Sequence, residues 1–432
     1  MFLTQAAFFL LFAAACNNTP RPQWGGEYAV PAYQTGAVMD IGLWSLQYEH
    51  IAAMAEAGFN VAMAEVDFGG HYTTAQQAKK YLDRAAEVNM KCIAMDTKFC
   101  IPISEYRPES YGQGAADKSN IGLYKDHPAF YGLCISDEPF SPTADTEAVI
   151  SLLKLKVGEF RETFPGKVPF INLSVWVKEA IEPFVKEVQP DFLSYDEYCI
   201  LSDKSIASSY LANLAKIKRI AMGAGIPAYD TLLTVGHFIP SGKRYATPDY
   251  NTLRWQVACT QTFGYAGFYH YNGNPDPNYG YDAIIKNGQK TQLYDDIKSV
   301  HADVRAWEHV YLSFEWEGIA AIESGGLNEL FFLIPDKTAK DKIPGIKKIA
   351  NSQDMLVGIF KDADGNRGYM LTNGTNPWQA KSASAEITFD GYDGVQVWEK
   401  GAPRVVNLDK DGAAVIELEP GEGKFLIPLK RA

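Results

Sequence analysis

The chain has 432 residues, 47% of them hydrophobic and 13% aromatic. This composition excludes intrinsic disorder as the main state and suits one large domain together with a smaller one. The 52 acidic residues exceed the 40 basic ones and leave a formal net charge of −12. Because phosphate backbones are bound through clustered positive charge, nucleic acid is not expected as a partner.

Residues 1–16 differ from the rest of the chain. Residues 1–15 are apolar apart from Thr4 and Gln5, and they end in three alanines directly before Cys16. A short apolar run closed by small residues is typical of an export signal. The position of Cys16 resembles the bacterial lipoprotein signal, which implies a lipid on Cys16 and a membrane anchor at the cell surface or in the periplasm. Residues 17–35 would follow Cys16 as a tether. An ordinary cleaved signal is the alternative.

Short apolar runs alternate with amphipathic stretches over residues 36–310. This alternation indicates βα units around a parallel sheet. We expect eight strands, at residues 38–44, 59–67, 91–96, 130–138, 169–176, 192–198, 228–235 and 266–272. The helices are expected at residues 46–57, 75–89, 146–163, 177–188, 205–224, 249–263 and 292–310. The count and the length predict a (β/α)₈ TIM barrel.

Residues 311–432 follow a different pattern, with closely spaced strands and turn sequences. Strands are expected at residues 355–360, 368–372, 385–389, 395–399 and 414–418. This spacing predicts a small antiparallel β-sandwich. Two interpretations of the sandwich stay open. It would be a carbohydrate-binding module if Trp378 or Trp398 stacks on sugar, and otherwise a cover over the outer barrel helices, which we favour.

Strand parity predicts which side chains face the barrel interior, because successive residues point to opposite faces. In the fourth strand Leu133 and Ile135 belong against the helices, together with Tyr131 and Asp137. Glu138 then points inward at the end of that strand. The same rule predicts further interior residues on the first, third, fifth and sixth strands, namely Asp40, Gly42, Trp44, Cys92, Ala94, Asp96, Asn172, Ser174, Trp176, Ser194, Asp196 and Tyr198.

Other polar residues are expected around the same end of the barrel. Glu65 and Asp67 share one face of the second strand, and His237, His270 and Asn272 lie at or just beyond the ends of the last two strands. Active sites of TIM-barrel enzymes are built at this end. Carboxylates beside indole rings fit hydrolysis of a glycosidic bond, in which one acid protonates the leaving oxygen and a second carboxylate attacks or activates water.

Several segments resemble barrel glycoside hydrolases. They are residues 127–139 (HPAFYGLCISDEP), 190–198 (PDFLSYDEY), 253–257 (LRWQV), 264–271 (GYAGFYHY) and 420–426 (PGEGKFL). The chain is similar to exported bacterial proteins described as glycosidases, loosely related to the family 42 β-galactosidases and clan A. This resemblance implies a TIM barrel, a carbohydrate substrate and catalysis by carboxyl groups.

The chain departs from clan A at the seventh strand. Clan A enzymes carry an acid/base Glu after Asn at the end of strand four and a nucleophilic Glu at the end of strand seven. Here strand four ends in Asp137 and Glu138, and the sequence has no Glu between Glu197 and Glu308. The resemblance implies that Glu138 is the acid/base. By inward parity we choose Asp196 as its partner, with Asp67, Asp96 and Glu197 in reserve and Asp137 if strand four is bulged.

The expected site therefore combines two catalytic residues, Glu138 and Asp196, with residues that bind the sugar. The binding residues are Trp44, Asp67, Asp96, Asp137, Trp176, Glu197, Tyr198, His237, His270 and Asn272. No metal and no cofactor are expected, because the cysteines lack zinc-site spacing and no Gly-rich phosphate loop follows the first strand.

Two other interpretations remain open at this stage. A barrel without the strand-seven Glu could capture glycans at the cell surface without cleaving them. Alternatively Asp67, Asp96 and Glu138 could hold Mg²⁺ for enolate or isomerase chemistry, with Lys98 or His270 as the base.

Overall fold

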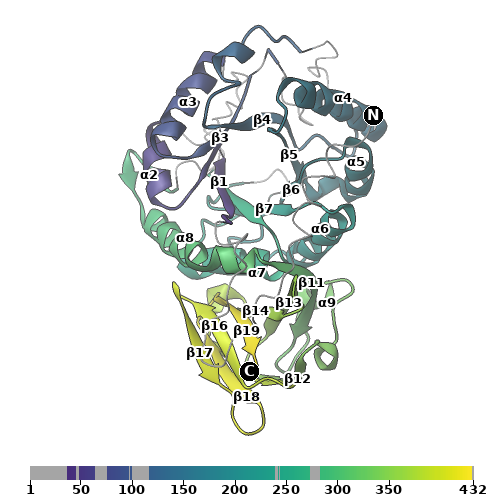
Figure 1. Cartoon of the computed structure of the whole chain (residues 1–432), viewed down its shortest axis with the longest axis vertical. Coiled ribbons are helices and arrows are strands. Elements are labelled where there is room, and N and C mark those ends of the chain that lie inside the picture. The colour runs from purple at the N-terminus through teal and green to yellow at the C-terminus, as the bar shows by residue number, and fades with distance from the viewer. Residues whose placement is uncertain are drawn as a thin grey trace.

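The computed structural model describes residues 37–44, 48–63, 75–96, 98–99, 116–238, 242, 244–272 and 283–430 (Figure 1). The side chains of residues 75–78, 176 and 402 are outside this description. The predicted lipidation site Cys16 and the predicted site residue Asp67 both lie outside the described residues.

Eight parallel strands close into a barrel in sequence order, which confirms the predicted TIM barrel. The strands are β1 (Asp40–Trp44), β2 (Val61–Met63), β3 (Lys91–Ala94), β4 (Phe130–Asp137), β5 (Val168–Ser174), β6 (Leu193–Asp196), β7 (Ala228–Leu233) and β8 (Gly267–Tyr271). Each lies within a predicted strand or extends one residue beyond it.

Helices surround the barrel (Figure 1). They are α2 (Ile51–Glu56), α3 (Ala75–Glu87), α4 (Thr146–Thr163), α5 (Ile181–Val188), α6 (Tyr210–Ala224), α7 (Tyr250–Thr262) and α8 (Gln292–Tyr311). Local sequence fixes where two of them start. The Asp145 carboxylate accepts from the first backbone amides of α4, and Asp249 and Thr252 form a capping box at α7.

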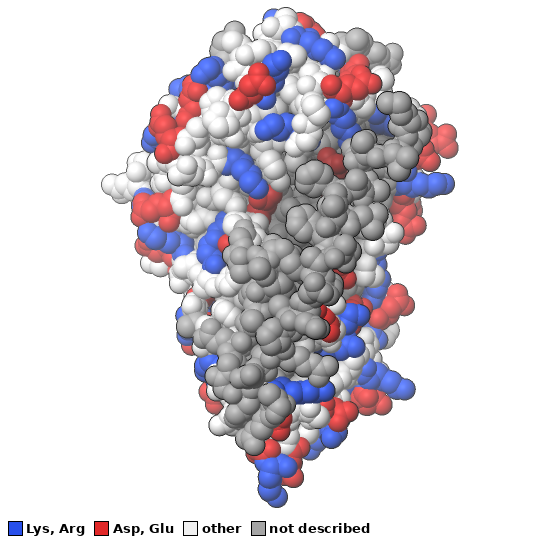
Figure 2. All heavy atoms as spheres, viewed as in Figure 1, with Lys and Arg blue, Asp and Glu red and all other residues white. Residues whose placement is uncertain are grey.

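Short elements complete the barrel domain. The 3₁₀ helices are η1 (Tyr48–His50), η3 (Ile121–Leu123) and η4 (Val175–Ala180), and β9 (Ile285–Lys286) pairs with β10 (Gln289–Lys290). Among the described residues no helix is long and apolar enough to span a membrane. On the face shown in Figure 2, acidic and basic side chains are interspersed over the described surface.

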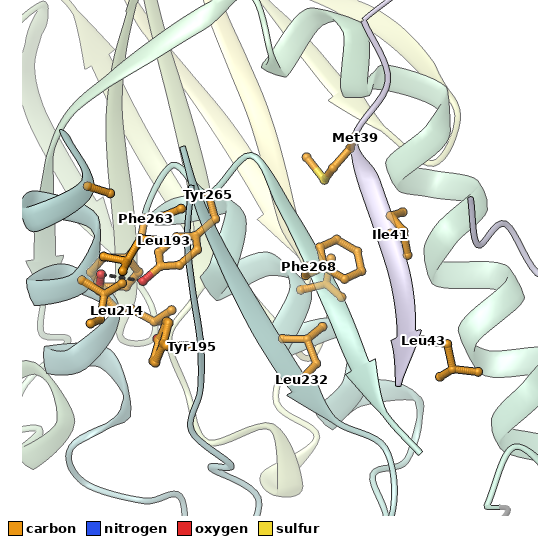
Figure 3. Packing of buried hydrophobic residues seen from close by; sticks show 14 of the residues in the cluster. Met39, Ile41, Leu43, Leu193, Tyr195, Leu214, Leu232, Phe263, Tyr265 and Phe268 are labelled. Atoms are coloured by element: carbon orange, nitrogen blue, oxygen red, sulfur yellow. Dashed lines mark hydrogen bonds between the residues drawn. The ribbon is translucent and has the colours of Figure 1, made fainter. Parts of the chain in front are cut away.

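The outer faces of the strands form the larger core with the helices. Figure 3 shows Met39, Ile41 and Leu43 beside Leu232 and Phe268, all fully buried on the helix side of the barrel. Aliphatic side chains on this side exclude water from the strand–helix contacts, and this burial is the main source of barrel stability.

The inner faces form a second, smaller core that fills the barrel. Its buried members are Trp44, Val61, Met63, Ile93, Met95, Cys134, Phe170, Phe192 and Tyr269. Two parity predictions are wrong here. Ile93 and Met95 face the interior, so Cys92 and Ala94 of β3 pack against the helices instead. Tyr131 faces inward, where its hydroxyl donates to Asp40 at 2.8 Å.

Two antiparallel sheets follow the barrel, as the sequence predicts. The larger one has the order β11 (Phe314–Ile322), β13 (Met355–Asp362), β14 (Arg367–Asn373), β19 (Gly423–Leu429), β16 (Gly394–Glu399) and β17 (Ala402–Asn407). The smaller one has the order β12 (Ile346–Asn351), β15 (Ala383–Phe389) and β18 (Ala413–Leu418). The short helices α9 (Glu329–Phe332), η5 (Lys340–Lys342) and η6 (Pro377–Gln379) connect strands. The sequence analysis missed β11, β12, β17 and β19.

The larger sheet is buried on both faces. One face forms the sandwich core with the smaller sheet, and the other packs on α7 and α8 of the barrel. A Cβ atom at Gly358 would lie 2.2 Å from the Thr262 carbonyl oxygen, so only glycine allows this approach of β13 to α7. Trp398 is buried in the same contact, with its ring 5.9 Å from that of His309, and Trp378 is partly buried there. These positions favour a structural cover over a sugar-stacking module.

Candidate active site

A bulge in β4 sets the geometry of the site. Cys134 pairs with Phe170 of β5, but Ser136 pairs with the next residue, Ile171, and the register then continues to Asp137 and Asn172. The extra residue reverses the parity of the strand end. Asp137 therefore faces the interior with Asn172, and its predicted outward orientation is wrong. Strand four is bulged, which is the condition under which the sequence analysis considered Asp137 as a partner of Glu138.

The Asn172 side chain joins two carboxylates. Its Nδ2 donates to Oδ1 of Asp196 at 2.9 Å and to Oδ1 of Asp137 at 3.2 Å. Its Oδ1 accepts from the Ser194 hydroxyl at 3.0 Å, so both ends of the amide are fixed. The inward orientation predicted for Asn172, Ser194 and Asp196 is confirmed.

Glu138 follows directly after β4 in a left-handed backbone conformation, with φ of 45°. Its backbone amide donates to the Asn172 carbonyl oxygen at 2.9 Å, which continues the pairing of β4 with β5. A side-chain hydrogen bond links Glu138 to Asp196. Positive φ is costly for a residue with a side chain and is found mainly where the surrounding structure enforces it. The carboxyl groups of Asp137, Glu138 and Asp196 thus form one partly exposed cluster.

The pKa of Asp196 is strongly perturbed. Burial and the neighbouring Asp137 charge raise the pKa of Asp196 to about 7, against the opposing effect of hydrogen bonds from Asn172 and Glu138. Two hydrogen-bonded carboxyl groups need a proton between them. The raised pKa means that this proton is retained up to nearly neutral pH, as general acid catalysis requires.

An aromatic wall lies beside the carboxyl cluster. We use this name for the four rings of Tyr198, His237, Tyr245 and Tyr271. The rings of Tyr198 and Tyr271 stack at 5.1 Å with an interplanar angle of 23°, and Tyr245 and His237 each lie within 5.5 Å of Tyr198. Burial raises the pKa of both Tyr198 and Tyr245, and the charge of Asp196 adds to the rise at each, so both rings lie near the carboxylates. Tyr245 and Tyr271 are binding candidates that sequence reasoning missed.

Among the described residues, Thr231 and Trp44 each place a buried polar atom in the barrel interior that has no hydrogen-bond partner there. Thr231 pairs with Asp196 in the β6–β7 register, so its side chain shares the interior face, and its Oγ1 is buried and unpartnered. Trp44, at the end of β1, is 6% exposed and also has an unpartnered Nε1. Unsatisfied buried polar groups are costly in a folded protein, so these two atoms stand out in the barrel interior.

Two predicted binding residues have other partners. Trp44 contributes to the inner core, with its ring against that of Phe170 at 5.3 Å, and is not an open sugar platform. Asp96 lies on the same face as Cys92 and Ala94, toward the helices. Its Oδ2 accepts from the Tyr124 hydroxyl at 2.9 Å, so its predicted position at the mouth is wrong.

Glu197 and His270 lie away from the cluster. Glu197 accepts from the Asn213 side chain at 2.8 Å and from Ser209, so it faces α6. His270 is fully buried between β8 and α8, and its Nε2 lies 3.0 Å from Nε2 of His301, so its predicted place at the mouth is wrong. Asn272 directly follows β8 and is buried, and its Oδ1 has no hydrogen-bond partner within the described part of the chain.

The predicted position of Trp176 at the end of the fifth strand is also wrong. The strand ends at Ser174, and Trp176 belongs to the 3₁₀ helix η4, so the parity argument does not reach it. Among the described side chains, no group of three or more His, Cys, Asp or Glu residues is arranged to hold a metal ion. Four cysteines in this part of the chain, Cys92, Cys134, Cys199 and Cys259, are buried free thiols.

Comparison with known proteins supports the fold. No protein-family model and no curated protein sequence matches the chain. A proposed alpha-galactosidase from Bacteroides fragilis matches with a TM-score of 0.53 at 11% identity, covering 92% of this chain and 80% of that chain. A beta-galactosidase from Rahnella sp. R3 matches with a TM-score of 0.52 at 9% identity, covering 90% of this chain and 100% of that chain.

A glycoside hydrolase family 5 protein from Bacteroides vulgatus gives a similar result, with a TM-score of 0.51 at 12% identity. This match covers 96% of this chain and 95% of that chain. All three matched structures are thus described as glycoside hydrolases. At such low identity the likeness establishes the shared architecture, a TIM barrel followed by a β-rich domain.

Proposed function

We propose that the protein is a glycoside hydrolase that cleaves an oligo- or polysaccharide at the C-terminal mouth of its barrel. The observation that carries this proposal is the cluster of Asp137, Glu138 and Asp196, which is partly exposed and retains a proton near neutral pH. The mouth is where TIM-barrel enzymes place their chemistry. The structural similarity to proteins described as glycosidases adds to the case.

Glu138 is the general acid of the proposed reaction. Its carboxyl group donates a proton to the glycosidic oxygen as the bond to the anomeric carbon breaks, and the resulting carboxylate then takes a proton from the incoming water. Asp196 is its partner, because the hydrogen bond between them keeps the proton at the pair. The aromatic wall offers flat apolar faces for a sugar ring, with Tyr198 and Tyr271 stacked beside the carboxyl groups.

A screen of nitrophenyl glycosides with the purified chain, with and without EDTA, tests this function. We expect turnover that is insensitive to EDTA and that falls as the pH rises above about 7, where Asp196 loses its proton. Chelator-sensitive turnover would point instead to metal-dependent chemistry. Binding of glycans in the mouth without any turnover would identify a capture protein and contradict the proposal.

We also propose that the protein is exported and anchored to a membrane through lipid on Cys16. The support is the apolar segment at residues 1–15 and the small residues before Cys16. Labelling of cells with a radioactive or alkyne-tagged fatty acid should mark the wild-type chain and not the Cys16→Ser variant. Equal labelling of both would contradict the anchor.

A further inference from the structure

The carboxyl groups of the proposed site all lie on one side of the mouth. Asp137 ends β4 and Glu138 follows it, and Asp196 ends β6, two strands away in the same barrel. Asn172 on the intervening β5 contacts two of them directly. Displacement at an anomeric carbon, however, needs groups on both faces of the sugar. A proton donor lies beside the leaving group, and an attacking group lies on the opposite face.

The described strand ends around the rest of the mouth offer no such attacking carboxylate. The interior residues at the ends of β8 and β1 are Tyr271 and Trp44. On β7, Asp230 faces the helices, and the sequence has no acidic residue from Thr231 to Tyr245. Within the described residues, which do not include Asp67 at the end of the second strand, the acid cluster is therefore suited to protonation and orientation more than to attack from the opposite face.

Two local distortions bring consecutive carboxyl groups into this cluster. Neighbouring residues of a regular strand point to opposite faces. The β4 bulge turns Asp137 inward, and the left-handed backbone of Glu138 keeps the next side chain at the same site, in hydrogen-bond contact with Asp196. Bulges and strained residues persist where the surrounding structure demands them, often at functional sites.

We propose that the sugar cleaved by this site carries a 2-acetamido group, whose carbonyl oxygen is the nucleophile, and that Asp137 binds the N–H of that group. This inference rests on the proposed glycosidase function and names its substrate class. Adjacent residues then match adjacent sugar carbons, with Glu138 at the oxygen on C1 and Asp137 at the substituent on C2. The unpartnered Thr231 Oγ1 and Trp44 Nε1 add hydrogen-bonding capacity in the interior below.

The proposed reaction balances within the enzyme and its substrate. The acetamido oxygen forms a bond to C1 while the bond from C1 to the leaving oxygen breaks, and Glu138 gives its proton to that oxygen. The N–H, more acidic in the resulting cyclic oxazolinium, is held by the Asp137 carboxylate. Water then attacks C1, Glu138 takes its proton, and the ring opens to restore the acetamido group. Attack from behind requires the 2-acetamido group to be trans to the leaving group, as in β-gluco and β-galacto sugars.

Paired substrates test the inference directly. We expect the purified chain to hydrolyse 4-nitrophenyl 2-acetamido-2-deoxy-β-glucoside or β-galactoside with a kcat/KM at least about 10²-fold above that of the 2-hydroxyl sugars, because an intramolecular nucleophile gains from proximity. Replacing N-acetyl by N-trifluoroacetyl should slow the reaction by at least about tenfold, since fluorine weakens the attacking oxygen.

The possible failures are distinguishable. Comparable rates for acetamido and hydroxyl sugars would overturn the inference and leave the glycosidase function intact. Failure to hydrolyse any sugar of the panel would overturn both proposals. Equal rates for N-acetyl and N-trifluoroacetyl substrates would also overturn the inference, whatever the activity.

Variants separate the roles of the two neighbours. Asp137→Asn should lower kcat on the acetamido substrate about 10²-fold with little change in KM, even with an activated dinitrophenyl leaving group. The Glu138→Gln variant should regain much of its lost kcat on the dinitrophenyl substrate, because this leaving group departs with little need for a proton. Asp191→Asn, at an exposed residue paired with Arg161, is the matched control for the charge change. If the activated leaving group also restored the kcat of Asp137→Asn, the assigned role of Asp137 in binding the acetamido N–H would be contradicted.

Discussion

Two carboxyl groups on neighbouring strands show why access matters more than a shifted pKa. Asp196 ends β6 and Asp230 lies in β7, and burial raises the pKa of each to about 7. Asp196 faces the barrel interior and is partly exposed beside Asp137 and Glu138. Asp230 faces outward and is completely buried between β7 and the helices, where Tyr210 and Thr260 donate to its Oδ2 at 3.1 and 2.9 Å.

The same contrast separates the histidines. His237 lies in the aromatic wall at the mouth, whereas His270 and His301 face each other between β8 and α8 with no exposed surface. Perturbed groups often mark functional sites, yet burial in a strand–helix core perturbs them equally. The interior face of the barrel therefore holds the groups that can meet a substrate, and the exterior face holds groups that act on stability.

The largest expected effect concerns the interior face. Glu138→Gln removes the proton donor without changing side-chain size, and we expect kcat/KM on an unactivated glycoside to fall by about 10²–10⁴-fold. The melting temperature should change little, because Glu138 is not part of the packed core. Glu187→Gln on the exposed surface of α5 is the control. Full activity in Glu138→Gln would remove the interior cluster from the mechanism.

The second effect concerns the exterior face. Asp230→Ala removes the carboxylate that accepts from the buried Tyr210 and Thr260 hydroxyls, of which Thr260 keeps the Gln256 carbonyl oxygen as an acceptor, and it opens a small cavity. Unfolding should therefore become easier by about 3 kcal/mol. Asp230→Asn keeps an acceptor and should lose less. Chemical denaturation measures both, and kcat per folded molecule should stay at the wild-type value. A large loss of kcat in either variant, with stability intact, would erase the distinction between the two faces.

The histidine pair makes stability depend on pH. Burial holds the pKa of His270 well below its usual range and lowers that of His301 to about 3, so both are neutral in the folded protein. The unfolded chain binds protons near pH 6.5, and stability is therefore present above that pH and lost as the pH falls below it. His301 alone should contribute a loss of about 2 kcal/mol at pH 5.

Proton uptake on unfolding gives the direct measurement. Calorimetry at pH 5.5 in buffers of different ionisation enthalpy should detect protons bound by the wild-type chain as it unfolds. The His270→Phe/His301→Leu double variant should bind roughly two fewer. Equal uptake in the two proteins would mean that these histidines are already charged when folded.

The sequence predicts the architecture well because the barrel rests on local periodicity. The helix expected at residues 146–163 matches α4, and the inward residues of β5 and β6 lie as parity predicts. The parity prediction failed where a strand departs from regular geometry and the amino-acid sequence does not mark the departure. The β4 bulge lies among Cys134, Ile135 and Ser136, and nothing in their side chains marks an extra residue.

Other misses follow from long-range contacts. His270 alternates with Tyr269 and Tyr271, and a strand with bulky residues on both faces gives no clue to its interior side. Tyr245 reaches the aromatic wall because the loop after β7 pairs with Leu201 across many residues. Asp96 follows β3 on the helix side, where it meets Tyr124 from a distant segment. Such contacts are properties of the folded chain, not of a local pattern.

The smallest expected effect links the site to stability. Asp196 has a raised pKa in the folded protein, so its burial costs stability as the pH rises from about 4 toward 7, and the cost is constant above that pH. Asp196→Asn removes this cost while an amide oxygen can still accept from Asn172. The variant should be more stable than wild type at pH 8, by on the order of 1–2 kcal/mol because water partly screens the carboxylate.

The difference in stability between Asp196→Asn and wild type should shrink strongly as the pH falls to about 4, where Asp196 is protonated in the folded wild-type chain and close to half protonated in the unfolded one. Melting curves recorded from pH 4 to pH 8 measure this convergence. Wild type being the more stable protein at pH 8 would show that Asp196 is stabilised by its neighbours and not strained among them. The interior carboxylates would then resemble the paired, structural groups of the exterior face, and the comparison of the two faces would no longer identify the site.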